Sequence, residues 1–489
     1  MGRHWSALLV AGAGDSADRN RKSYTVNVDP ERWRFGGGAA GTVLHPIVLV
    51  WMLIAVIVML RWPRKFGLPV FLFSTFLIPS GQEILVGGAH FFVYRIIVLA
   101  GLIGLAFAKR SRNISFLAGG WNSIDTAFLL AISFHFVAFC LLYRDTAAVV
   151  NQVGFIWDYL GGYFLLRCLI QSEKDINTAI KCFAYLAVVL AICMVREQVT
   201  GQNIFGLLGG VRLVSYVRDG QIRSEAVFAH AILAGTFGAT VLPLFVWLFR
   251  SGTAKVLSLA GIVSSAVMTL TSASSTSFMA YGAGILAMCF WPLRKRLRVV
   301  RWGLVIVLVA LHLVMKAPVW ALIERIDVVS ASSGYHRFQL VDQFIRHAGE
   351  WWLLGTKSNA DWGDEMIDTS NAYVEWGTGG GLFALVFFVL LITRCFGRIG
   401  KTRRAIEGKD RRKAWLLWFL GAAMFAHIVA FFGIFYFDQM RVAWFALLAM
   451  ISTATAIRII RSAKELPLGL PSQISPEPLL NSLPPISVG

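Results

Sequence analysis

Charged residues are scarce in this chain. Asp, Glu, Lys and Arg together make up 15% of its 489 residues, whereas a soluble globular protein carries about 25%. Hydrophobic residues reach 57%, and the mean hydropathy is +0.65. A surface of this composition is too apolar to face water. The scarcity of charge therefore excludes an ordinary soluble domain and predicts an integral membrane protein of all-α class.

Paired cysteines and clusters of metal ligands are missing as well. The six cysteines lie within or at the ends of apolar runs, and no Cys-x-x-Cys pair occurs. We interpret them as small buried hydrophobic residues rather than as disulfides or metal ligands. No metal and no cofactor are therefore expected.

Acidic residues are fewer than basic ones. The chain has 27 Asp and Glu residues and 46 Lys and Arg residues, which gives a net charge of +19. Such a charge can indicate nucleic acid, but here the Lys and Arg residues lie in short clusters between apolar runs, as the positive-inside bias produces. No basic stretch has the interleaved aromatic residues of a strand-binding surface. The charge therefore predicts contact with membrane lipid and no nucleic-acid partner.

Apolar runs of roughly 17–25 residues, each long enough to cross a bilayer as a helix, follow one another along the chain. They predict a transmembrane helical bundle of about twelve spans if the segment broken by Pro79 and Gly81 is re-entrant, and thirteen otherwise. The multi-span region covers residues 42–464, between a polar tail (1–41) and a Pro/Ser-rich tail (465–489). The expected spans are Leu44–Leu60, Leu68–Leu85, Phe91–Ala108, Ala127–Leu142, Val149–Leu169, Ala179–Val195, Ala226–Phe249, Val256–Leu270, Phe278–Trp291, Leu304–Met315, Gly381–Ile392, Trp415–Ile434 and Val442–Ile457.

The basic clusters predict which loops face which side. The run 394–413 is expected to be a cytoplasmic loop because basic residues concentrate there. Alternation then puts two other loops outside, about residues 196–225 and 316–370. Thirteen spans would place the N-terminal tail outside, although its arginines prefer the inside, so the side of the N-terminus stays open.

The larger outer loop is long for a connection, and long loops usually carry function. Between Tyr335 and Ile345 its apolar residues recur with helical spacing, at Phe338, Val341, Phe344 and Ile345. The spacing predicts an amphipathic helix that lies on the outer surface and caps a cavity.

Arginines in both outer loops run against the positive-inside bias. Arg212, Arg218 and Arg223 precede one span, and Arg337 lies in the expected amphipathic helix. Either these side chains reach lipid headgroups, or they form an anion site. Arginine suits a diphosphate because its planar fork makes paired, charge-assisted hydrogen bonds and keeps its charge.

Three segments in this order carry a resemblance to a known family. They are Arg223–Ala231 at the start of a span, Arg337 followed by Trp352–Thr356, and Ser370–Val374 followed by Gly377, Gly380 and Gly381. Together they resemble the O-antigen ligase/O-antigen polymerase superfamily of bacterial membrane glycosyltransferases, over roughly residues 200–395.

The resemblance implies a metal-independent, inverting glycosyltransferase of the bacterial inner membrane. Its donor would be a polyprenyl-diphosphate-linked glycan, its acceptor a glycan or a lipid, and its active side the periplasm. Arg223 and Arg337 would bind the diphosphate. Arg218, His336, Ser370 and Tyr373 would line the substrate cavity.

The chain departs from the family at one important position. The family histidine, often assigned as the base, is replaced here by Ser370. Serine is no base near neutral pH unless it is activated, so the catalytic candidates are Asp368, Glu375 and Asn371. A nearby histidine, His336 or His347, and the absence of any base in this segment remain alternatives.

Two other functions stay open at this level. One is a transporter or flippase of lipid-linked saccharide, although no inverted repeat is visible. The other is a non-catalytic scaffold for exopolysaccharide assembly.

Three further polar features lie in or beside the spans. Asp158 is an ionisable residue within an apolar run and is a functional candidate if it lies deep in the membrane. Asp438 and Arg441 are expected to pair with each other. The Ser/Thr run Thr269–Ser277 either lines the cavity or lets two helices pack closely, and packing is favoured.

Overall fold

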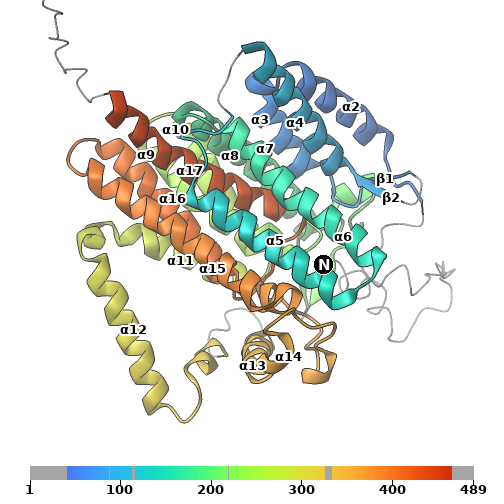
Figure 1. The fold of residues 1–489 in the computed structure, drawn as a ribbon. Coiled ribbons are helices and arrows are strands. Elements are labelled where there is room, and N and C mark those ends of the chain that lie inside the picture. The colour runs from blue at the N-terminus through green and yellow to red at the C-terminus, as the bar shows by residue number, and fades with distance from the viewer. Residues whose placement is uncertain (1–40, 87–88, 113–115, 219, 325–332, 465–489) are drawn as a thin grey trace, which may run out of the picture.

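The computed structural model describes residues 41–86, 89–112, 116–218, 220–324 and 333–464. Within these ranges the chain is built of helices and two small antiparallel hairpins (Figure 1). The predicted all-α class is confirmed. Both expected tails, apart from Gly41, lie outside the described residues.

The N-terminal part holds three helices and a hairpin. Helices α2 and α3 begin at prolines, because proline suits the first helical turn, where no N–H partner is needed. Past Ile78 the chain turns through Pro79 and Gly81 into the hairpin, so the segment Leu68–Leu85 is not one continuous helix. The bounds are α2 (Pro46–Arg61), α3 (Pro63–Leu77), β1 (Glu83–Val86), β2 (Ala89–Phe92) and α4 (Val93–Arg112).

The next helices lead to the smaller outer loop. The expected span Val149–Leu169 is helical but contains a π-helical turn, which starts one residue before Asp158. The loop then carries a second hairpin. The bounds are α5 (Ser123–Tyr143), α6 (Thr146–Ile156), η1 (Trp157–Gly161), α7 (Gly162–Leu169), α8 (Glu173–Thr200), η2 (Ile204–Leu208), β3 (Tyr216–Arg218) and β4 (Gln221–Arg223).

The middle of the chain forms α9 to α12. Helix α12 has no buried residue and stands apart from the other helices in Figure 1. A helix that is apolar all round and unburied suits lipid rather than water. The bounds are α9 (Ala231–Arg250), α10 (Lys255–Thr271), α11 (Ser275–Cys289), η3 (Trp291–Lys295) and α12 (Leu297–Val314).

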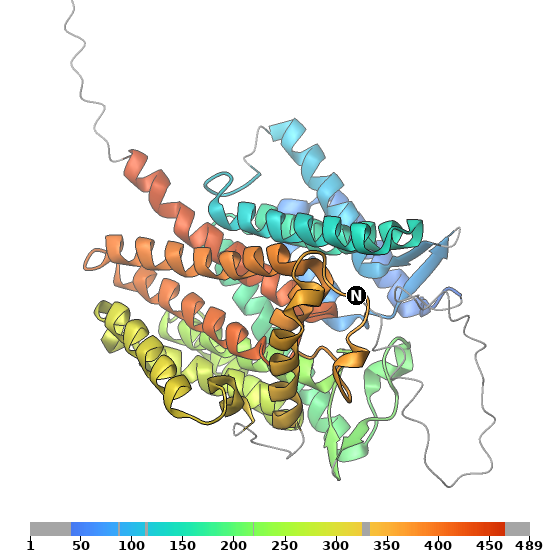
Figure 2. The same ribbon diagram turned by 60° about the horizontal axis from the view of Figure 1, so that its bottom comes forward.

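The larger outer loop contains the expected helix, α13 (Ser333–Arg346), which crosses the end of the bundle (dark gold in Figure 2). Its predicted apolar face is wrong in part. Arg337, Leu340 and Phe344 are buried, whereas Ile345 is 46% exposed. The buried face of α13 is therefore rotated from the predicted one, and it includes Arg337, whose guanidinium points inward to a hydroxyl group. The loop also holds η4 (Val319–Ile323), α14 (Ala348–Trp351) and η5 (Ala360–Trp362).

The C-terminal helices are α15 (Ala372–Ile406), α16 (Arg411–Ala430) and α17 (Asp438–Lys464). Helix α15 has a kink at Gly381, where the expected span Gly381–Ile392 begins, and its second part continues to Ile406, into the basic run 394–413. The cytoplasmic side of that run remains a prediction. Lys and Arg are good helix formers, and their long stems can cover apolar surface while the charge faces water.

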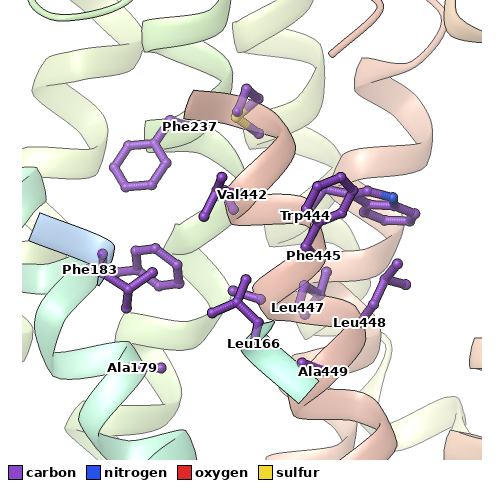
Figure 3. Packing of buried hydrophobic residues seen from close by; sticks show 14 of the residues in the cluster. Leu166, Ala179, Phe183, Phe237, Val442, Trp444, Phe445, Leu447, Leu448 and Ala449 are labelled. Carbon is purple, nitrogen blue, oxygen red and sulfur yellow. The ribbon is translucent and has the colours of Figure 1, made fainter. Parts of the chain in front are cut away.

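Helix α17 is the centre of the core. Its residues Val442–Ala449 are buried, and Val442 lies on the side of α17 toward Phe183 of α8 and Phe237 of α9, whereas Trp444 and Leu448 lie on the opposite side (Figure 3). The same core holds a buried ion pair, in which Arg167 Nε donates to Asp125 Oδ1 over 2.9 Å. The cost of removing this charge pair from water is offset only because each partner also makes further hydrogen bonds.

Six described helices are long and apolar enough to cross a membrane. They are α5, α8, α9, α12, α15 and α16. These helices support a membrane protein and agree with the composition. The count of about twelve spans remains a prediction.

Candidate active site

An open cleft lies where the loop 316–370, predicted to be the larger outer loop, meets the start of α15. It encloses about 900 Å³, counting its solvent-open mouth. Asp368, Ser370 and Glu375 line it, so three predicted site residues lie together. The other lining residues are Phe139, Tyr143, Thr356, Lys357, Ser358, Asn359, Ile367, Thr369, Thr378, Gly379, Ile434, Phe435 and Phe437.

The wall of the cleft is built by two glycine-containing segments that resemble the family's motifs. Thr356 N donates to the Thr378 carbonyl, and Leu382 N donates to the Trp352 carbonyl, each over 2.8 Å. Gly381 has φ +72°, and a Cβ atom there would lie 2.4 Å from the Leu353 oxygen. The glycine is needed both for this backbone conformation and for the close approach of the two segments.

Asn371 begins α15. Its side-chain oxygen accepts hydrogen bonds from Tyr373 N at 2.9 Å and Val374 N at 3.3 Å, which is N-cap geometry. Its amide donates to the Phe432 carbonyl over 3.3 Å. The Tyr373 hydroxyl donates to the Ile428 carbonyl over 3.3 Å. Asn371 and Tyr373 thus join α15 to α16 and its end, and neither lines the cleft.

The two carboxyl groups in the cleft differ in their surroundings. Asp368 Oδ1 is buried and has no hydrogen-bond partner among the described residues. Burial raises the pKa of Asp368, although His336 nearby acts in the opposite direction. Glu375 accepts a hydrogen bond from the Thr369 hydroxyl and lies in the first turn of α15. Asp368 is therefore the better placed of the two to take up a proton.

His336 precedes Arg337 on α13 and reaches the same segment. Its Nε2 lies 3.2 Å from the Asp368 carbonyl oxygen. The contact ties α13 to the loop that carries Asp368.

Arg223 lies at the end of the second hairpin and is buried. Its Nε donates to the Ser272 carbonyl over 3.4 Å. The segment that follows is held firmly, because Ser224 N donates to the Thr271 carbonyl over 3.1 Å and the Glu197 carboxylate accepts from Ala226 N over 2.9 Å. Arg218, at the end of β3, is partly buried and does not line the cleft.

Arg337 reaches the same place from the other loop. Its Nη2 donates to the Thr276 hydroxyl over 3.0 Å, and this hydroxyl donates to the Gly433 carbonyl over 3.3 Å. Arg223 and Arg337 thus meet the Ser/Thr run Thr269–Ser277 at positions four residues apart. Ile434, the neighbour of Gly433, lines the cleft, whereas neither Arg223 nor Arg337 is among its described lining residues.

Asp438 and Arg441 interact electrostatically, as expected. The carboxylate at ion-pair distance is that of Asp158, whose Oδ2 lies 3.6 Å from Arg441 Nη1. Asp158 also accepts two hydrogen bonds from Arg95, at 2.8 and 3.0 Å. Sequence reasoning missed this cluster because its members come from helices that are far apart along the chain.

Within the described ranges, no group of three or more His, Cys, Asp or Glu side chains is placed to hold a metal ion.

Compared with known proteins, the chain matches no family model and no curated protein. Its resemblance to the ligase/polymerase superfamily therefore remains a prediction based on the motifs.

Proposed function

We propose that this protein transfers or polymerises a glycan from a polyprenyl-diphosphate-linked donor. The observation that carries the proposal is the meeting of Arg223 and Arg337 at one Ser/Thr run, next to the wall of a cleft that holds Asp368. Buried arginines from two separate loops suit a dianionic leaving group.

In the proposed reaction, an acceptor hydroxyl in the cleft attacks the anomeric carbon of the donor sugar. The Asp368 carboxylate takes the hydroxyl proton as general base. The bond between the anomeric carbon and the diphosphate oxygen breaks, and polyprenyl diphosphate leaves with the electron pair. Arg223 and Arg337 stabilise the charge that develops on this leaving group.

The proposal includes the setting of the reaction. The protein would be a multi-pass protein of the bacterial inner membrane, with the cleft facing the periplasm. The acceptor would be a glycan or a lipid, as in surface polysaccharide biosynthesis. The apolar, unburied α12 supports contact with membrane lipid.

The test uses purified protein with a polyprenyl-diphosphate oligosaccharide and measures the release of polyprenyl diphosphate. We expect Arg337→Ala to abolish release and Arg337→Lys to retain little, because lysine lacks the planar fork. Arg346→Ala is the matched control, since Arg346 lies on the same helix with its side chain 69% exposed.

Unchanged release by the Arg337→Ala protein would refute the diphosphate site. If the wild-type protein releases no polyprenyl diphosphate but moves the lipid between leaflets, the protein is a transporter and not a transferase. If it shows neither activity, a non-catalytic scaffold replaces the transferase as the proposed function.

A further inference from the structure

A group of aromatic and basic side chains lies at the far end of α15 from the cleft. Trp291 of η3 and Trp415 of α16 stack with their ring centroids 4.1 Å apart. The guanidinium carbon of Arg250, at the end of α9, lies 4.2 Å from the Trp415 centroid, and that of Arg294 lies 4.4 Å from the Trp291 centroid. Arg403, near the end of α15, donates to the Arg294 carbonyl over 3.1 Å. We call Arg250, Trp415, Trp291 and Arg294 the Arg–Trp stack; it joins the end of α9 to the start of α16, just before α12 begins.

Positive charge exceeds negative charge around the stack. Arg294 and Arg403 share the Glu407 carboxylate, at 3.3 and 3.5 Å. Within the part of the chain that the structure describes, four arginines of this region are exposed and have no carboxylate at ion-pair distance, namely Arg250, Arg296, Arg298 and Arg301. This end of the molecule therefore presents positive charge that the protein does not neutralise.

The conformation of Arg250 suits an anion. A guanidinium that stacks on an indole uses its flat face, so the N–H groups at its edge stay available as donors. Arg250 is exposed, and these N–H groups are accessible from outside. Because the stack already orders the side chain, Arg250 loses little freedom when it binds a ligand.

The start of α12 adds to the same surface. Its N-cap is Arg296, Arg298 lies in its first turn, and this turn holds no acidic residue. Cations at this place oppose the positive end of the helix dipole, and the first N–H groups of a helix have no partner within it. A bound anion relieves the repulsion and satisfies the N–H groups.

Apolar surface continues directly from these arginines. Along α12, Val299 is 70%, Trp302 58% and Ile306 65% exposed, and Ile285 and Leu286 of the preceding α11 are exposed as well. A ligand that matches the whole surface is anionic at one end and apolar over the rest. This combination favours an acidic phospholipid over free phosphate, nucleic acid or an acidic peptide, and basic sites beside membrane helices bind such headgroups.

We propose that the Arg–Trp stack and the start of α12 form a binding site for an anionic phospholipid. Arg250 and Arg298 bind its phosphate group, and its acyl chains lie along the apolar surface of α12. The lipid thereby covers a helix that stands apart from the bundle and has no buried residue of its own (Figure 1). The inference goes beyond the proposed function and depends only on the membrane character of the protein.

The experiment titrates lipid into the purified full-length protein in detergent and counts bound lipid molecules by native mass spectrometry. The probes are phosphatidylglycerol and phosphatidylcholine with the same acyl chains, and inorganic phosphate serves as competitor. We expect phosphatidylglycerol to bind at least about tenfold more tightly than phosphatidylcholine, whose choline group cancels the phosphate charge. Inorganic phosphate at the concentration of the lipid should not displace it, because it lacks the acyl chains.

The double variant Arg250→Gln, Arg298→Gln should bind phosphatidylglycerol at least about tenfold more weakly than the wild type. The matched control is Lys174→Gln, Lys409→Gln, which removes the same charge from two exposed residues at this end of the bundle. Lys174 belongs to this end because its neighbour Glu173 pairs with Lys413 of α16 over 3.6 Å. All four side chains are exposed, so both variants should fold, and size-exclusion profiles check this.

Equal affinity of the wild type for the two lipids would overturn the inference without any variant. An equal loss of affinity in the control variant would also overturn it, since net charge alone would then explain the binding. Displacement by inorganic phosphate would replace the phospholipid site by a site for a free anion. No glycan or donor lipid enters this experiment, so its result and that of the transfer assay stand apart.

Discussion

At the scale of single residues, the cleft distinguishes two carboxyl groups that the sequence leaves equivalent. Asp368 has a buried oxygen without a partner in the described part of the chain, and burial raises its pKa. Glu375 is engaged by the Thr369 hydroxyl at a helix start. An acceptor base needs a free oxygen and a raised proton affinity, and Asp368 combines the two.

We therefore expect Asp368→Asn to lower the initial rate of polyprenyl diphosphate release by about 10²–10⁴-fold, and Glu375→Gln to lower it far less. The wild-type rate should rise with pH through the raised pKa of Asp368, since the base acts only when ionised. Asp361→Asn, exposed in the same loop, is the control. Normal turnover by Asp368→Asn would exclude this residue as the base.

Glu225 offers a test of stability at the same scale. It is 3% exposed, and burial raises its pKa from 4.5 to about 8, with Arg212 opposing the shift. Between these two values the unfolded chain has lost the proton that the folded chain keeps. The free energy of unfolding should then fall by up to about 1.4 kcal/mol for each pH unit as the pH rises, and level off above about 8.

Glu225→Gln should remove this pH dependence, because glutamine has no proton to lose. Thermal unfolding in detergent, followed from near pH 5 to near pH 9, measures the difference between variant and wild type. Glu365→Gln, an exposed residue, should keep the wild-type slope. If the stability of Glu225→Gln changes with pH as steeply as that of the wild type, other groups cause the pH dependence.

At the scale of elements, the kink of α15 decides the shape of the cleft. The sequence places four glycines between residues 377 and 381, but the contacts that require them appear only in the folded chain. Gly381 and Gly355 let the loop after α14 lie against α15 at backbone distance, and Gly377 makes room for the ring of Phe344 of α13. The glycine-rich motif and the arginine helix are thus parts of one packed unit.

Replacing Gly381 by Ala should destabilise the protein by about 1–3 kcal/mol, since alanine is strained at a positive φ and its Cβ would lie 2.4 Å from the Leu353 oxygen. Gly397→Ala is the control within the same helix, because nothing lies within 4 Å of its added Cβ. The midpoint of thermal unfolding compares the two. Equal midpoints would show that the kink is not needed.

At the scale of the whole molecule, the proposed topology puts the cleft and the basic turn after α15 on opposite sides of the membrane. In a chain freed of its native cysteines, Ser358→Cys and Lys409→Cys each place one exposed thiol at these positions. We expect a membrane-impermeant thiol reagent to reach position 358 from the periplasm and position 409 only after the inner membrane is opened. Labelling of both from one side would contradict the proposed orientation.

The sequence by itself determined the helical class and the membrane character, because both depend on local composition and on runs of apolar residues. It also predicted that the outer loop holds a helix and that Asp368, Ser370 and Glu375 lie close together, since these residues are neighbours in the chain. It placed the start of a span at Gly381, where α15 is kinked, but missed the helical turns before it and the extension to Ile406. Hydropathy marks the apolar centre of a helix, and basic residues extend the helix without any apolar signal.

Only the tertiary structure decided which side chains meet across long separations. The Arg337 guanidinium donates to the Thr276 hydroxyl, and Arg441 forms an ion pair with Asp158 in addition to its interaction with Asp438. The small cavity lined by Tyr159, Trp376 and Trp444 likewise takes its walls from four helical elements, α5, η1, α15 and α17, and a connecting segment. Periodicity and spacing in the sequence describe one helix or strand at a time, whereas these contacts form where different elements pack together. Burying a charged side chain in an apolar bundle is costly, and the packing lowers that cost by bringing partners of opposite charge together.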